Sequence, residues 1–128
     1  MTPFDSLSDN DWNLIKGCLN AAVRGPFFSE REFHALFGLT RSEVAAVLER
    51  WPALPSEIPL GYESAAEFQA VAVNNALNNL LGFPHGFNGA DFVREVGASE
   101  PEVAATLNRL RSDPHFDSGG KGYFDRMM

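Results

Sequence analysis

The stretch Phe28–Trp51, which reads FSEREFHALFGLTRSEVAAVLERW, decides the fold. It holds two capping boxes, Ser29–Glu32 and Thr40–Glu43. In a capping box, a hydroxyl side chain and an acid three residues later satisfy the free backbone N–H groups at a helix start. Gly38 stands between the boxes, where glycine favours the left-handed turn that ends a helix. The stretch therefore predicts two short helices joined by a tight corner.

The same start signal recurs along the rest of the chain. Further capping boxes are Ser8–Asp11, Ser64–Glu67 and Ser99–Glu102, with a weaker one at Asn88–Asp91. These starts, and the Gly and Pro residues that follow, predict helices over 8–24, 29–37, 40–51, 64–81, 88–96 and 99–111. Segment 52–62 has three prolines and is expected to be a loop. No segment has the pattern of a strand, so we predict an all-α fold.

The chain also repeats itself at an offset of 59 residues. Phe28–Trp51 aligns with Phe87–Leu110, with nine of 24 positions identical, including the run Glu-Val-Ala-Ala. We therefore predict one compact six-helix domain spanning 1–128, made of two pseudo-repeated three-helix units at about 5–51 and 64–111, with a flexible tail over 113–128. The alternative is that short helical hairpins converge on the same Phe, Gly and capping residues.

Composition and charge limit the function. The chain has 128 residues, 45% of them hydrophobic, and a net charge of −7. An acidic balance argues against a general binder of nucleic acid or anionic membranes, whose surfaces are basic. A single cysteine, Cys18, cannot form an internal disulfide and fits a reducing, cytoplasmic location. No stretch of the sequence has the length of apolar residues needed to span a bilayer.

Both copies of the repeat resemble the helix-turn-helix of bacterial regulators. The resemblance rests on the turns Gly38–Thr40 and Gly97–Ser99, each followed by an apolar residue in the second helix. It implies that Arg41 and Ser42 would face the major groove of DNA. In the second copy Glu100 takes the place of Arg41 and would repel phosphates. A DNA-binding regulator with tandem helix-turn-helix units is therefore an alternative function, and a purely structural corner is the other interpretation.

Most of the predicted middle helix, 64–81, lies in a run of 23 residues, from Phe68 to Ala90, that has no charged side chain. Four amides lie opposite its apolar face: Asn74, Asn75, Asn78 and Asn79. Asparagine is a poor residue for a helix interior, so these amides are expected to make specific hydrogen bonds. Their partners are either loop 52–62 and segment 83–90 of this chain, or a second protein, which includes a homodimer.

Segment 82–88, GFPHGFN, makes an aromatic turn directly after that helix. Its His85 and Phe87 are expected to plug the gap between the two units, because phenylalanine is so often buried. An exposed version would instead contact a partner. Both residues are therefore candidates for a binding surface.

The sequence offers little for catalysis. His34, His85 and His115 show no spacing typical of a metal site, and no nucleophile motif is found, so we expect neither metal nor cofactor. Our first hypothesis is a small acidic, non-enzymatic interaction or regulatory protein that binds another protein, in the manner of an inhibitor or immunity protein. An enzyme with a site near His85 or His115 is a further alternative.

Overall fold

The computed structural model describes residues 3–113, which contain six α-helices and no strand. The all-α prediction is therefore confirmed for this part of the chain; the predicted flexible tail lies almost wholly outside it. A short 3-10 helix, η1 (Pro3–Ser6), precedes the α-helices. These are α1 (Asp9–Arg24), α2 (Glu30–Phe37), α3 (Arg41–Arg50), α4 (Ala65–Gly82), α5 (Ala90–Val96) and α6 (Glu100–Arg111).

The predicted N-caps account for five of the six helix starts. Ser29, Thr40 and Ser99 form complete capping boxes, in which the acid also accepts from the N-cap backbone. Ser8 and Ser64 accept from the backbone N–H three residues on. Because each cap satisfies N–H groups that would otherwise lack a partner, these residues set where the chain turns into helix.

Two predicted helix boundaries, the start of α5 and the end of α4, are wrong. α5 begins after Gly89, not at Asn88, and its N-cap makes no side-chain hydrogen bond. Gly89 has a φ of 58°, a conformation that suits glycine, and Asp91 pairs with Arg94 at 3.1 Å instead of completing a box. The helix predicted to end at residue 81 runs one residue further, to Gly82, and Phe83 is its C-cap.

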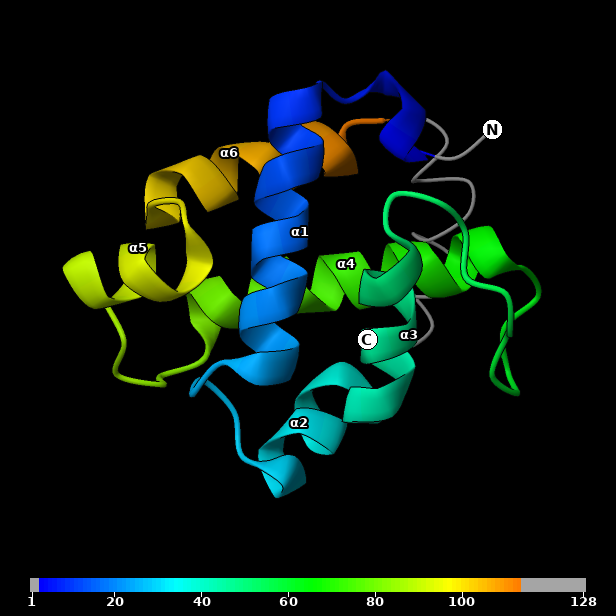
Figure 1. Ribbon diagram of the computed structural model, residues 1–128, viewed down its shortest axis with the longest axis horizontal. Coiled ribbons are helices and arrows are strands. Elements are labelled where there is room, and N and C mark those ends of the chain that lie inside the picture. The colour runs from blue at the N-terminus through cyan, green and yellow to red at the C-terminus, as the bar shows by residue number, and fades with distance from the viewer. Residues whose placement is uncertain (1–2, 114–128) are drawn as a thin grey trace.

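α1 crosses in front of α4, and the other helices pack around this crossing (Figure 1). α1 contacts α3 and α5, whereas α4 contacts α6 and α2. α1 also contacts α6, and α4 also contacts α3. If α1, α2 and α3 correspond to α4, α5 and α6, each of these contacts in one half has its counterpart in the other. A duplicated unit would require such a correspondence. The duplication itself stays a prediction.

The core lies at the crossing and extends under both pairs of short helices. Ile15 and Leu19 of α1 and Val73 and Leu77 of α4 are fully buried. Gly17 permits a close approach between α1 and α5, because a Cβ added there would lie 2.4 Å from the carbonyl oxygen of Val96. α5 therefore packs closely on α1, which belongs to the other half of the chain.

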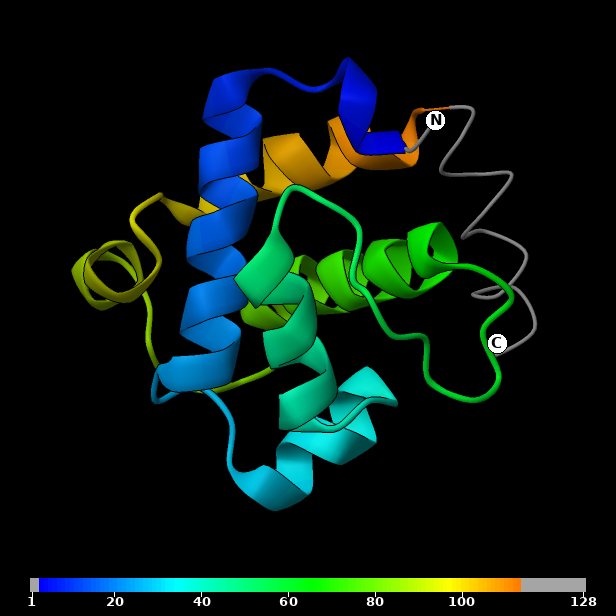
Figure 2. The same cartoon turned by 45° about the vertical axis from the view of Figure 1, so that its right-hand side comes forward.

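The loop between α3 and α4 lies on the opposite side of the crossing from α5 (Figure 2). It opens with a cis peptide bond between Trp51 and Pro52. Among the helices of residues 3–113, none combines the length and the apolar character needed to cross a bilayer.

Candidate partner-binding surface

The asparagines of α4 are mostly turned inward. Asn74 and Asn79 are buried, and Asn75 is half-buried. The Nδ2 of Asn75 donates to the carbonyl of Phe37 at 2.9 Å, and that of Asn79 donates to the carbonyl of Leu36 at 3.3 Å. These are carbonyls at the end of α2, which have no partner within their own helix. The amides therefore fasten α2 to α4, and the partners expected for them, loop 52–62 and segment 83–90, were wrong.

Two of the amide oxygens of this set accept from α6. Arg111 donates from Nε to Asn74 Oδ1 at 3.0 Å and from Nη2 to Asn78 Oδ1 at 3.4 Å. Partial burial lowers the pKa of Arg111, and neutral amide acceptors accommodate its charge without a buried carboxylate. Asn78 is the one exposed member of the four, so it offers the most surface to a partner, and half-buried Asn75 offers less.

His85 is fastened in place by hydrogen bonds from both ring nitrogens. The backbone N–H of Phe87 donates to Nδ1 at 3.0 Å. Nδ1 is therefore the acceptor, and the proton sits on Nε2, which donates to the carbonyl of Leu80 at 2.8 Å. This arrangement uses both nitrogens of a neutral imidazole and closes the end of α4.

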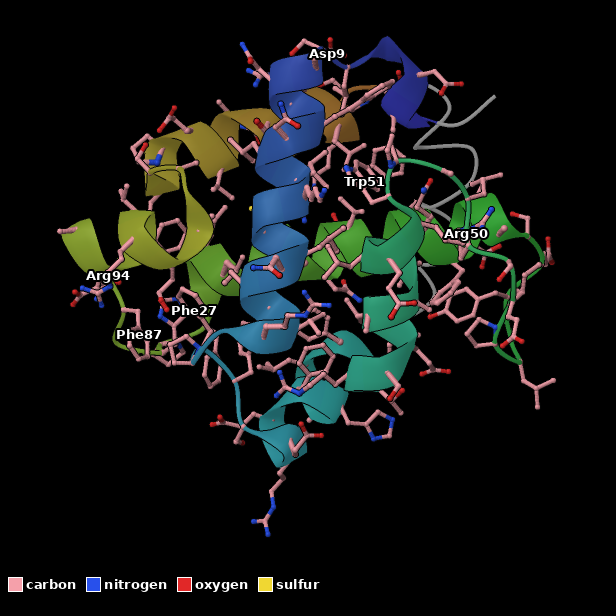
Figure 3. The ribbon with its side chains drawn as sticks, in the orientation of Figure 1. Asp9, Phe27, Arg50, Trp51, Phe87 and Arg94 are labelled. Carbon is pink, nitrogen blue, oxygen red and sulfur yellow. The ribbon has the colours of Figure 1, made fainter. Side chains whose placement is uncertain are left out.

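The aromatic turn packs between the two halves of the chain. Phe27 lies three residues after the end of α1. Its ring centre is 4.6 Å from that of His85 and 5.4 Å from that of Phe87 (Figure 3). Phe27 also approaches Phe92 of α5 at 6.0 Å. This is the geometry of a plug. His85 and Phe87 are half-buried, so part of each stays open to a partner.

Arg41, the first candidate for DNA contact, is engaged within the molecule. Its guanidinium donates to the carbonyls of Ala22, Val23 and Phe28 and pairs with Glu30. It also lies 4.6 Å above the ring of Phe33. An arginine with these contacts ties the end of α1 to the start of α3 and has little capacity left for a phosphate.

Ser42, the second candidate, is exposed at the start of α3. In the second copy, Glu100 accepts from the backbone N–H of Gly89 at 3.2 Å. The helix-turn-helix resemblance thus stays a prediction, with Ser42 as the one candidate residue free to contact DNA. A charge change at Arg41 would not test it cleanly, because that change would also disturb the fold.

The structure describes two of the three histidines named for catalysis, His34 and His85. His34 is exposed on α2, and His115 lies outside the described residues. No group of three His, Cys, Asp or Glu side chains able to hold a metal occurs within 3–113. Burial raises the pKa of the Cys18 thiol to about 12, which leaves almost no thiolate at neutral pH.

The exposed apolar side chains of the structure gather on one loop. Four large apolar residues are exposed within 3–113, and three of them, Leu54, Ile58 and Leu60, lie between α3 and α4. We call residues 52–63 the apolar loop. Its charged residues are two exposed acids, Glu57 and Glu63. A rigid, acidic loop that exposes aliphatic side chains has the features of a contact surface for another protein.

The apolar loop is held at its base. Nε2 of Gln69, which is fully buried, donates to the carbonyls of Pro52 at 3.2 Å and Ala53 at 3.1 Å. Nε of Arg50 donates to the carbonyl of Leu54 at 2.7 Å. Pro55, within the loop, is buried. The loop therefore presents its tip, residues 56–61, from a fixed base.

A cleft of about 320 Å³ opens beside the start of the apolar loop. We call it the tryptophan cleft, because Trp12 of α1 and Trp51 at the end of α3 both line it. The other lining residues are Asp9, Asn13, Lys16 and Pro52. Asp9 at the start of α1 and Trp51 are both labelled in Figure 3.

A larger groove, of about 540 Å³, runs along the other side of α1 against α6. Its polar centre is Asp11, which accepts from Thr106 Oγ1 at 3.1 Å and from Arg109 through both carboxylate oxygens. The hydrogen bond from Arg109 holds the pKa of Asp11 below its ordinary value. The carboxylate is thus already satisfied, and the groove offers a partner mainly Asn10, Asn13 and the aliphatic floor.

No protein-family model matches this chain, and searches of curated proteins and of solved structures found no match.

Sequence reasoning missed the apolar loop as a binding surface. The signal was present, since three prolines in segment 52–62 prevent a helix from burying the aliphatic residues among them. It also missed the two indoles of the tryptophan cleft, because Trp12 and Trp51 lie 39 residues apart and meet only in the fold.

Proposed function

We propose that this chain is a small, acidic, non-enzymatic protein that regulates another protein by binding it through the apolar loop. The observation that carries the proposal is the gathering of Leu54, Ile58 and Leu60 on one anchored loop. A soluble domain normally buries most such side chains, and exposed apolar side chains that gather on one segment favour an interaction surface.

The length and anchoring of the loop support the same function. Residues 51–64 separate α3 from α4 without regular secondary structure. Loops of this length are uncommon in compact domains unless they have a function. Anchoring by Gln69 and Arg50 reduces the conformational entropy that the loop would lose on binding, so affinity is gained by pre-organisation.

The test compares two exposed apolar positions. A photoreactive amino acid is placed at position 58 in the apolar loop, and a separate variant carries it at position 93 in α5. Val93 is a matched control, because it is 43% exposed and Ile58 is 46% exposed. We expect one discrete cross-linked protein from position 58 and none from position 93.

A second comparison tests whether the captured protein binds nonspecifically. The triple variant Leu54→Ser, Ile58→Ser, Leu60→Ser should keep its helical circular dichroism and lose the bound protein, whereas Val93→Ser should keep both. Equal capture by the wild type and the triple variant would contradict the proposal, as would cross-links of the same pattern from both positions.

A further inference from the structure

We infer that the tryptophan cleft receives a cationic side chain, arginine in preference to lysine, from the protein that binds the apolar loop. This inference rests on the proposed function and names the chemistry of the partner. Pro52 belongs to both the cleft and the loop, so one partner surface can reach both features.

Two of the residues that line the cleft are tryptophans whose indole N–H groups are already hydrogen-bonded. Trp12 Nε1 donates to the carbonyl of Phe4 at 2.7 Å, and Trp51 Nε1 donates to the carbonyl of Trp12 at 2.9 Å. The ring of Phe4 packs edge-on against Trp51 at 4.9 Å. Since both indole N–H groups are used internally, the indoles contribute ring carbon and no free donor to the lining, mainly from half-buried Trp12 because Trp51 is only 7% exposed. Such a surface attracts a cation, and tryptophan does so better than other aromatic residues.

The charges around the cleft favour a cation at one end. Asp9 is exposed, lines the cleft, and has no ion pair within residues 3–113. Glu57 and Glu63 on the neighbouring apolar loop add negative charge, and the chain as a whole carries −7. A basic partner is therefore attracted to this face and guided toward it.

Lys16 is the one cation in the lining, and its position leaves the Asp9 end open. It lies seven residues after Asp9 on α1, which is about 10 Å along a helix axis. Its long aliphatic stem can cover the apolar wall while its ammonium group stays in water. Lys16 thus weakens a cation site without blocking it, and its removal should strengthen the site.

The size of the cleft and the shape of its walls favour arginine. A volume of about 320 Å³ is near the lower limit of small-ligand pockets, which suits one side chain and not a larger ligand. The planar guanidinium can stack on an indole while it donates to a carboxylate, which an ammonium group cannot do.

The experiment uses the fluorescence of the isolated protein, whose two tryptophans both line the cleft. The probe is N-acetyl-arginine amide, and its neutral counterpart is N-acetyl-citrulline amide. We expect a saturable change with the arginine compound and a markedly weaker response with the citrulline compound. Equal responses, or no saturable change with either compound, would overturn the inference.

Charge variants give the sign of the site. Asp9→Asn should weaken arginine binding about two- to fivefold, as expected for the loss of an exposed ion pair. Lys16→Gln should strengthen it. Glu95→Gln, on α5 and outside the cleft lining, is the control and should leave it unchanged. The reverse pattern for Asp9 and Lys16 would show an anion site and overturn the inference.

The two proposals fail separately. The triple variant of the apolar loop should keep the arginine response, because none of its three substitutions lies in the cleft lining. Loss of cross-linking specificity with an intact arginine response would reject only the proposed function. A specific cross-link from position 58 together with no arginine response would reject only the cation site.

Discussion

Asp11 shows how much of this fold depends on single polar side chains. It joins the first long helix to the last through Thr106 and Arg109, residues 95 and 98 positions away in the sequence. The carboxylate is buried, and each of its oxygens accepts at least one hydrogen bond. Replacing it by alanine leaves a buried hydroxyl and a guanidinium without their acceptor. We expect Asp11→Ala to cost about 2 kcal/mol of unfolding free energy, measured by urea denaturation.

The same contact predicts an acid dependence. The pKa of Asp11 is lowered in the folded protein, chiefly by the hydrogen bond from Arg109. A lowered pKa stabilises the fold above the ordinary aspartate value of about 3.9, and this contribution is lost as the pH falls through the folded value. The unfolding free energy is measured by urea denaturation at a series of pH values. Between about pH 5 and about pH 2, that of Asp11→Asn should fall less steeply than that of the wild type. Parallel curves would contradict this role.

Arg41 makes a second residue-scale prediction. Three backbone carbonyls and Glu30 accept from one guanidinium. Lysine keeps the charge but lacks the planar fork that reaches several acceptors at once. Arg41→Lys should therefore lower the unfolding free energy by about 1–3 kcal/mol in urea denaturation. The control is Arg31→Lys on the exposed face of α2, which should change it by less than about 0.5 kcal/mol.

At the scale of elements, two glycines within helices test the packing of α1 on α5. A Cβ at Gly17 would meet the Val96 carbonyl oxygen, whereas a Cβ at Gly82 would meet nothing within 4 Å. Gly17→Ala should therefore destabilise the protein by about 1–3 kcal/mol through overpacking. Gly82→Ala should stabilise it by up to about 1 kcal/mol, because alanine loses less backbone entropy on folding. Thermal unfolding followed by circular dichroism measures both, and equal shifts would contradict the close helix contact.

The elements show why helix starts were easier to predict than side-chain partners. A capping box depends on neighbours three residues apart, so Ser29, Thr40 and Ser99 announce their helices in the sequence alone. The amide of Asn75 depends on Phe37, which is 38 residues away. That pairing follows from how α2 packs on α4, and nothing local specifies it. The predicted start of α5 was wrong for a different reason. Gly89 is the N-cap there, with a backbone conformation that suits glycine, so Asn88 does not cap the helix.

At the scale of the whole molecule, the fold consumes most of the groups that the sequence offered for function. Asn74, Asn79 and Arg41 are each hydrogen-bonded across elements, and His85 closes the end of α4. Of the surfaces that stay open, the proposed function uses the apolar loop and the tryptophan cleft. The sequence signals the loop only through its three prolines, and it does not signal the cleft, because the two indoles lie 39 residues apart.

The crossing of α1 and α4 makes the two halves dependent on each other. α1 is covered by α5 and α6 from the second half, and α4 is covered by α2 and α3 from the first. Each half alone would expose the apolar side chains that the other buries, at a cost of about 2 kcal/mol for each large one. We therefore expect fragments 1–63 and 64–128 to show weak helical circular dichroism and no cooperative thermal transition. Mixed in equal amounts, they should regain both, because the interface between them is the core. A cooperative transition in either fragment alone would show that the halves are separate domains and contradict the single core.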